Sequence, residues 1–320
     1  MNSTIHKLID IGVNLNDEMY NGIYHSKQVH INDVANVLYR AQQSHVHTII
    51  LTSGDVHEIQ KNIDIIQKYQ STTTIKLYTT VGLHPTRSSQ YPTTMQLQSK
   101  YLDELREYIM NYKQYIICIG ECGLDYDRLQ YSTAEQQKSA FIVQLQLASE
   151  CNLPLFLHNR NTNHGFIDII EQYKYIINRV SGVVHSYTGT LDELNELLQY
   201  NLYIGVNGCS LKTHDNLNVV SHIPLDRLLI ETDAPWCTIK QTHAAYQYVN
   251  THFNTVKKNK YIVNGSDHDQ MTLIKDRNEP CTLISIVQVL SKIRNESIDD
   301  IVTACYNNTC KLFFPSNSPT

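Results

Sequence analysis

Eight short runs of apolar residues recur along the chain, and most are followed by a helical pattern before the next run begins. The runs are Lys7–Val13, His47–Ser53, Lys76–His84, Tyr115–Glu121, Leu153–His158, Gly182–Ser186, Leu202–Gly208 and Leu228–Pro235. Near-continuous apolar strands belong in a sheet that is covered on both faces, and helices between strands provide that cover. Eight strand–helix units are the number in a closed (β/α)8 barrel of the TIM type, which we therefore predict.

The competing fold is a doubly wound open sheet, which usually opens with a glycine-rich phosphate turn after its first strand. The first run continues as DIGVNLN and has no G-x-G-x-x-G spacing. A barrel needs about 250 residues, so about 70 remain for insertions. We predict one domain over residues 1–320, with an insertion at approximately 238–276 after the eighth strand. The last helix is expected over LISIVQVLSKI, followed by a polar tail after Phe314.

Charge and cysteine usage narrow the class of protein. Lys and Arg number 26 against 31 Asp and Glu, so the net charge is −5 and any affinity for nucleic acid must be local. The eight cysteines contain no C-x-x-C pair and are spread singly, as at Cys151, Cys209, Cys237 and Cys281, which predicts reduced thiols. The chain begins with no signal-peptide pattern and contains no membrane-length apolar stretch. We expect an intracellular protein of the nucleus or cytoplasm, without membrane contact.

Residues capable of chemistry stand at the C-terminal ends of six of the runs. They are Asn14, His84, Glu121, His158, His185 and Asp233. A single polar residue at such a position usually only makes hydrogen bonds in a loop. In a barrel, however, all six would meet at the mouth where barrel enzymes have their active sites. Two imidazoles and two carboxylates suit Zn²⁺, Mn²⁺, Co²⁺ or Mg²⁺, which activate water, so the pattern predicts a metal-dependent hydrolase.

The motifs around these residues resemble those of the TatD deoxyribonucleases, metal-dependent members of the amidohydrolase-like barrel group. The matching segments are DIGVNL at 10–15, GLHP at 82–85, IGECGLDY at 119–126, LHNR at 157–160, HSYTGT at 185–190, ETDAPW at 231–236 and RNEP at 277–280. Their order fits from about Leu8 to Phe313, and the combination of GECGLD, ETDAP and RNEP is highly specific. The KQTHA segment at 240–244 and the insertion before RNEP are similar to the eukaryotic branch.

The resemblance implies a ligand set for one or two divalent cations (Mg²⁺, Mn²⁺, Zn²⁺ or Co²⁺). Glu121 would bridge two cations, His158 and His185 would complete one site, and Asp233 would hold the second and orient or deprotonate the water. The broader family pattern is D-x-H-x-H on the first strand, but Gly12 and Asn14 occupy the histidine positions here.

This departure leaves only Glu121, Asp233 and the Asn14 carbonyl as donors for the second cation. All of these are hard oxygens, whereas the first site keeps two nitrogen donors. We therefore expect a tightly held transition metal at the histidine site. A looser Mg²⁺ or Mn²⁺ is expected at the other.

Three further basic side chains are candidates for contact with the scissile phosphate: His84, Arg160 and Arg277. Arg277 also has a structural interpretation, in which it pairs with Glu279 while Pro280 starts the last helix. Asp125 and Asp127 fit a turn better than a ligand set. Asp10 would either brace the base of the mouth or only bond to the backbone.

Lys257, Lys258 and Lys260 lie near Tyr248 and Phe253 in the insertion, and these residue types grip a nucleic-acid backbone and stack on unpaired bases. A lysine-rich loop on an acidic protein is more often a solvated surface. We predict DNA contacts there and leave the second interpretation open.

Three functions are compatible with these sequence features. The first is a metal-dependent deoxyribonuclease, and the resemblance implies DNA as substrate and removal of nucleotides from 3′ to 5′. The second is a hydrolase of a lactone, amide or aminoacyl ester on the same barrel, favoured by a closed apolar pocket and disfavoured by an open basic groove. The third is a noncatalytic scaffold, which the missing histidine pair motivates. No obligate protein partner is indicated, and the oligomeric state stays open.

Overall fold

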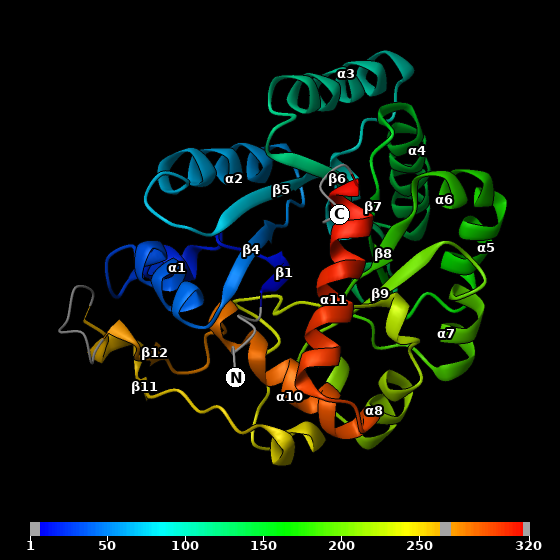
Figure 1. The fold of residues 1–320 in the computed structure, drawn as a ribbon. Helices are drawn as coiled ribbons and strands as arrows, with labels where there is room; N and C mark the ends of the chain where they lie inside the picture. The colour runs from blue at the N-terminus through cyan, green and yellow to red at the C-terminus, as the bar shows by residue number, and fades with distance from the viewer. Residues whose placement is uncertain (1–6, 263–269, 316–320) are drawn as a thin grey trace.

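The eight apolar runs form eight parallel strands in the computed structural model, which describes residues 7–262 and 270–315. They follow one another around the barrel in chain order (Figure 1). The strands are β1 (Leu8–Val13), β4 (Val46–Leu51), β5 (Lys76–Val81), β6 (Ile116–Asp125), β7 (Leu155–Arg160), β8 (Gly182–Val184), β9 (Leu202–Val206) and β10 (Leu228–Ile230). The predicted TIM-type barrel is therefore confirmed.

The barrel closes between β1 and the segment that follows β10. Val13 forms a parallel bridge with Ala234, and the Asp233 amide donates to the Gly12 carbonyl at 2.9 Å. Beneath this bridge, the buried Asp10 carboxylate accepts from the Thr232 amide at 2.9 Å and from the Thr232 hydroxyl at 2.6 Å. The Asp10 carboxylate therefore braces the base of the mouth by accepting hydrogen bonds from both the backbone and the side chain of Thr232.

Two apolar layers follow from the alternation of side chains along each strand. On β1, Ile9 and Ile11 point into the barrel, where they pack with Ile50, Phe156 and Leu229. The alternate residues of the strands pack outward against the helices. The lower barrel is therefore filled with apolar side chains, and the space available for chemistry lies at the C-terminal ends of the strands.

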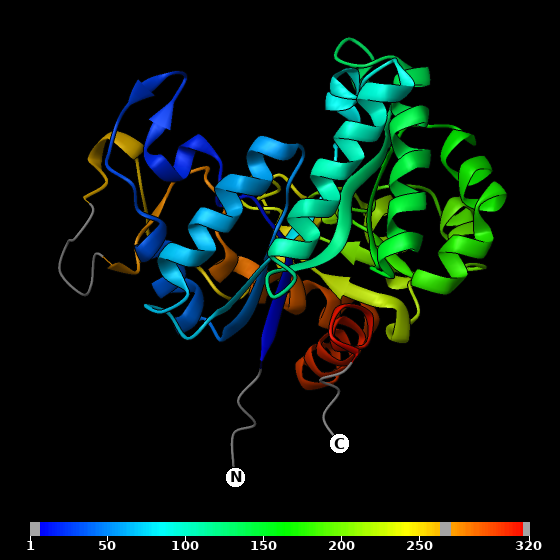
Figure 2. The ribbon, with the colours of Figure 1, turned by 90° about the horizontal axis from the view of Figure 1, so that it is seen from above.

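Helices surround the barrel and cover the outer face of the strands (Figures 1 and 2). They are α1 (Val34–Gln43), α2 (Val56–Tyr69), α3 (Met95–Asn111), α4 (Ala134–Cys151), α5 (Gly165–Gln172), α6 (Lys174–Val180), α7 (Leu191–Leu197), α8 (His214–Ser221), α10 (Leu283–Arg294) and α11 (Ile298–Phe313). Capping starts α4 and α7, because the Thr133 and Thr190 side chains each accept from a backbone amide in the first turn.

The prediction that the chain's last helix ends with LISIVQVLSKI is wrong. That segment forms α10, and a second helix, α11, begins after the Ser297 cap. Its residues Cys310, Leu312 and Phe313 join the apolar cluster inside the barrel, so α11 covers the end where β1 begins (Figure 2). The short polar stretch before Ser297 is a helix junction, with Asn295 in the left-handed conformation.

The described part of the insertion contains little regular structure. It forms the short parallel pair β11 (Thr255–Val256) and β12 (Leu273–Ile274). It reaches the hairpin of β2 (Ile23–Tyr24) and β3 (Lys27–Gln28), where the Lys258 ammonium lies 4.4 Å from the centre of the Tyr24 ring. None of the described helices is long and apolar enough to cross a membrane.

Candidate active site

The structure brings all six strand-end residues to one cavity at the C-terminal mouth of the barrel. Its volume is about 870 Å³. Its lining includes Asn14, His84, Glu121, His158, His185 and Asp233. These six residues divide into two groups. We call His84, Glu121, His158 and His185 the histidine side. Asn14 and Asp233, together with the neighbouring Gly12 and Glu231 behind the cavity wall, form the aspartate side.

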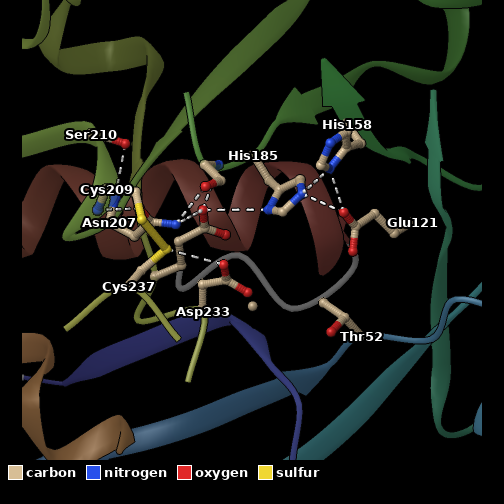
Figure 3. Close-up of polar contacts among 12 residues, drawn as sticks. Thr52, Glu121, His158, His185, Asn207, Cys209, Ser210, Asp233 and Cys237 are labelled. Carbon is tan, nitrogen blue, oxygen red and sulfur yellow. Dashed lines mark hydrogen bonds and ion pairs between the residues drawn. A yellow bond between two sulfur atoms is a disulfide. The ribbon is translucent and has the colours of Figure 1, made fainter. Parts of the chain in front are cut away.

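On the histidine side, three imidazoles surround one carboxylate oxygen. Glu121 Oε1 lies 2.6 Å from His158 Nδ1, 2.7 Å from His185 Nε2 and 3.2 Å from His84 Nε2. Figure 3 shows His158 and His185 pointing toward Glu121 from neighbouring strands. The two ring nitrogens that face Glu121 are themselves only 3.3 Å apart.

Burial and charge act against each other in this cluster. Burial by itself would raise the pKa of Glu121, but the neighbouring His185 and His84 outweigh it and hold that pKa well below its ordinary value. Burial would lower the pKa of His185, yet Glu121 and Glu231 together raise it well above its usual range. Desolvation dominates at His84 and lowers its pKa. The cluster therefore holds an ionised carboxylate among closely packed imidazoles.

This donor set fits a divalent cation. Ligand atoms of His84, Glu121 and His158 all lie within 4.8 Å of one another. Ring nitrogens that crowd one oxygen and each other at 3.3 Å are oriented as ligands of a common ion would be. Several nitrogens with one carboxylate oxygen favour a transition metal over Mg²⁺.

Two further carboxylates stand behind the histidines, and the sequence reasoning assigned neither of them to the site. Asp125 Oδ2 lies 3.5 Å from His158 Nε2, and Glu231 Oε1 lies 3.5 Å from His185 Nδ1. Carboxylates in this position fix the tautomer and orientation of a metal-binding imidazole. The signal that could have pointed to Glu231 is its place in the ETDAPW motif, two residues before Asp233 in the segment that follows β10. Asp125 also accepts from the Asp127 amide at 3.1 Å, so it forms the predicted turn as well.

The aspartate side offers oxygens that are already hydrogen-bonded to the protein. The Asn14 amide donates to Asp233 Oδ1 at 3.1 Å, and its carbonyl oxygen accepts from the Thr52 hydroxyl. Asn14 therefore orients Asp233, and its own oxygen is engaged. Burial raises the pKa of Asp233 to about 7, although His185 acts in the opposite direction.

Glu231 occupies the space in which the first missing histidine would stand. A β-carbon on Gly12 would lie 2.6 Å from Glu231 Oε2. Glu231 is fully buried, and its other oxygen accepts from the Ser186 amide at 2.5 Å and the Asn207 side chain at 3.2 Å. Because the hydrogen bonds to Oε1 hold this carboxylate, a side chain at position 12 would have to displace Glu231 Oε2, which favours glycine there. The presence of Gly12 in place of the first histidine of D-x-H-x-H is thus linked to the buried Glu231, which lies in the segment after β10.

The other predicted contact residues lie in different places. Arg160 lines the cavity and pairs with Asp127 at 2.9 Å. Arg277 does not line it: its guanidinium is buried and pairs with Asp33 at 2.6 Å and Glu279 at 2.8 Å. The structural interpretation of RNEP, with Arg277 paired to Glu279, describes this arrangement.

The three lysines of the insertion also lie away from the cavity. Lys257, Lys258 and Lys260 are absent from its lining. The ammonium group of Lys258 lies instead on the face of the Tyr24 ring. The insertion therefore places these cations beside the β2–β3 hairpin.

The expectation that all cysteines are reduced thiols is wrong for two of them. Cys209 and Cys237 form a disulfide with their Cα atoms 5.0 Å apart, while the other six cysteines are free. The pair joins the loops that follow β9 and β10, and both residues line the cavity. The Cys237 sulfur lies 3.3 Å from Asp233 Oδ2. Because the two cysteines are 28 residues apart, only the packing of adjacent strands brings them together.

A parallel barrel with a buried histidine–carboxylate cluster at its mouth defines a hydrolase of the amidohydrolase-like barrel class. The TatD related DNase family model matches residues 9–314. The chain is 35% identical over 310 residues to deoxyribonuclease Tat-D of Schizosaccharomyces pombe, covering 96% of this chain and 95% of that protein. This chain therefore belongs to the TatD family of deoxyribonucleases, hydrolases that act on phosphodiester bonds.

Two further relatives support the same assignment. A 3′-5′ ssDNA/RNA exonuclease TatD of Pectobacterium carotovorum is 34% identical over 233 residues, which are 72% of this chain and 80% of that protein. The crystal structure of a TatD family hydrolase from Entamoeba histolytica superposes with a TM-score of 0.88 at 39% identity, covering 98% of this chain and all of that one. The predicted family and fold are both confirmed.

Proposed function

We propose that this protein is a divalent-metal-dependent deoxyribonuclease that removes nucleotides from the 3′ ends of DNA. The observation that carries the proposal is the convergence of the histidine side on Glu121, across an open cavity from Asp233. The 3′-5′ direction is supported by the printed activity of the Pectobacterium relative.

The residues divide the work as follows. Glu121, His158 and His185 would hold the first cation, and Asp233 with Glu121 would hold the second. Bound cations supply Lewis acidity and lower the pKa of water. Asp233 lines the same cavity as these ligands, so its carboxylate is placed to orient the attacking water and accept its proton.

Two residues remain for the substrate phosphate. His84 and Arg160 both line the cavity, and they would donate hydrogen bonds to the phosphate oxygens as charge gathers there. Arg160 keeps its pairing with Asp127, which fixes the direction of its guanidinium. Arg277 is left out of this set because its buried ion pairs occupy it elsewhere.

We propose that the two cation sites differ in affinity. The histidine side presents nitrogen donors held by Asp125 and Glu231, whereas the aspartate side presents oxygens only. A transition metal would be bound tightly at the first. Mg²⁺ or Mn²⁺ would occupy the second more weakly and arrive with the substrate phosphate.

The open, polar lining of the cavity supports a charged substrate over a lactone or an aminoacyl ester. Its walls carry both acidic and basic side chains; the basic ones are Lys61, Arg87, Arg128, Arg160 and Lys212, of which Arg87 and Arg160 are already paired with carboxylates. A closed apolar pocket, which the alternative substrates require, is not what surrounds these catalytic groups. Against the scaffold hypothesis, Glu121, His158, His185 and Asp233 are all present and line one cavity.

The test is cleavage by purified protein stripped of metal and then supplied with Mg²⁺, Mn²⁺, Zn²⁺ or Co²⁺. Oligonucleotides labelled at the 5′ end are compared with oligonucleotides labelled at the 3′ end and with small ester substrates. We expect metal-dependent shortening from the 3′ end and no ester hydrolysis of comparable rate. Cleavage that survives both Glu121→Ala and Asp233→Ala would show a contaminating nuclease and defeat the proposal.

A further inference from the structure

The only tryptophan of the chain, Trp236, stands exposed on the wall of the catalytic cavity. It follows Asp233 by three residues, lines the same cavity and is 53% exposed. An indole is a large apolar group that usually packs into a core or an interface. Here the fold leaves it facing solvent on the wall of the cavity that holds the histidine–carboxylate cluster.

The turn that carries Trp236 is held in place from several directions. The Trp236 amide donates to the Asp233 carbonyl at 2.9 Å, and the Asn278 amide donates to the Pro235 carbonyl at 3.0 Å. The next residue, Cys237, is bonded to Cys209. The indole is therefore presented on a fixed backbone, so little conformational freedom of the backbone is lost when a ligand stacks on it.

A cation without an ionic partner lies on the same wall. Lys212 lies three residues after Cys209 in the loop that follows β9, and it is an exposed residue of the cavity lining. The two loops are in close contact, since a β-carbon on Gly208 would overlap the Cys237 carbonyl oxygen. Arg87 and Arg160 each pair with carboxylates, whereas Lys212 has no ion pair within residues 7–262 and 270–315. This lysine is therefore available to bind an anionic ligand.

From this juxtaposition we infer that Trp236 is a stacking surface for an unpaired nucleobase and that Lys212 binds a phosphate of the same strand. The inference rests on the proposed nuclease function and adds the groups that select the substrate. A flat π-face accepts any base, which gives affinity without sequence preference. A base can reach the indole only when it is free of its complementary strand, so this wall favours an unpaired 3′ end over a blunt duplex end.

Because Trp236 is the only tryptophan, its fluorescence reports directly on the proposed contact. The experiment titrates the full chain, with Mg²⁺ present, with a short oligothymidylate whose phosphorothioate linkages resist cleavage. A second strand of the same length has abasic sugars at its 3′ end. We expect the normal strand to quench the indole emission to saturation and the abasic strand to bind more weakly, by about 5- to 150-fold.

Variants separate stacking from a general loss of structure. Trp236→Ala should weaken binding of the normal strand by a similar factor and leave the abasic strand unchanged, whereas Trp236→Phe should recover most of the affinity. Lys212→Gln should weaken both strands equally and make binding less dependent on salt. Matched controls are Tyr175→Ala, an exposed aromatic on α6 outside the cavity, and Lys311→Gln on α11.

The outcomes distinguish this inference from the proposed function. Unchanged indole emission at saturating strand, or equal weakening of both strands by Trp236→Ala, would overturn the stacking role even if the enzyme cuts DNA. Quenching that the abasic strand fails to produce would support it even if no cleavage were found with any metal, which would defeat the nuclease proposal alone.

Discussion

The two sides of the catalytic cavity are built on different principles. The histidine side gathers nitrogen donors around the Glu121 carboxylate and braces them with Asp125 and Glu231. On the aspartate side, Asp233 belongs to a chain of hydrogen bonds: the Asn14 side chain donates to Asp233, and the Thr52 hydroxyl donates to Asn14. One side is thus prepared to receive a cation, whereas the other must exchange existing hydrogen bonds to do so.

This difference bears on the two histidines of the broader family pattern that this chain lacks. The lost ligands both belong to the aspartate side, where Glu231 fills the space beside Gly12. The same carboxylate orients His185 on the histidine side. Glu231 therefore fills the space that a histidine at position 12 would need, and it also orients His185.

The largest expected effect comes from breaking the histidine side. Glu121→Gln removes the charge on which the three imidazoles converge, so we expect loss of the tightly bound metal and a fall in kcat of about a thousandfold or more, equivalent to several kcal/mol of charge stabilisation. Metal content after gel filtration and oligonucleotide cleavage measure these effects. The exposed Glu107→Gln on α3 serves as the matched control. Full metal retention by Glu121→Gln would contradict the assignment.

The aspartate side should respond differently. Asp233→Asn keeps the hydrogen bond to Asn14 but removes the negative charge and the proton acceptor. We expect kcat to fall by about a hundredfold, within the range for general bases, while the histidine side still binds one metal tightly. Calorimetric titration of the metal-free variant with Mn²⁺ or Zn²⁺ measures the retained site. Loss of both sites together would show that they are not independent.

A smaller effect concerns the space around position 12. Gly12→Ala places a methyl group against the fixed Glu231 carboxylate, so we expect the free energy of unfolding to fall by about 1–3 kcal/mol. Urea unfolding measures it. In a Glu231→Ala background the penalty of Gly12→Ala should largely vanish. An equal penalty in both backgrounds would place the clash elsewhere, with Phe156 the next nearest group at 3.4 Å.

A separate effect, on stability alone, is a change of the free energy of unfolding with pH at the base of the mouth. Burial raises the pKa of Asp10 to about 8 from 3.8, although the bonds from Thr232 lower it. Between about pH 4 and pH 8 the unfolded chain therefore releases a proton that the folded chain keeps, so stability from this group is full at low pH and falls as pH rises.

Asp10→Asn removes this dependence. The wild-type protein should lose stability relative to the variant by up to about 1.4 kcal/mol per pH unit across that interval, with no further change above about pH 8. Thermal or urea unfolding at several pH values provides the comparison, and the exposed Asp64→Asn on α2 is the control. Parallel stability curves for wild type and Asp10→Asn would contradict the raised pKa.

Much of the architecture could be predicted because it is encoded locally. The residues of each apolar run are enough to predict a buried strand. Eight such strands alternating with helices are the number that a closed TIM-type barrel requires. The same periodicity placed Glu121, His158, His185 and Asp233 at strand ends, and a parallel barrel necessarily gathers such ends at one mouth. The sequence does carry a signal for α11, since the Ser297 cap precedes apolar residues at helical spacing, but its packing against the far end of the barrel depends on the tertiary structure.

Other features depended on which distant residues become neighbours. Arg277 and Asp33 are 244 residues apart, and only their packing shows that the arginine is buried in ion pairs instead of facing a phosphate. The Cys209–Cys237 bond and the exposure of Trp236 likewise follow from the contact between the loops after β9 and β10. The order of residue types determined the strands, the metal-binding chemistry and the family. Barrel closure decided which charges are neutralised and which face the substrate, because burial and pairing are properties of spatial neighbours and not of sequence position.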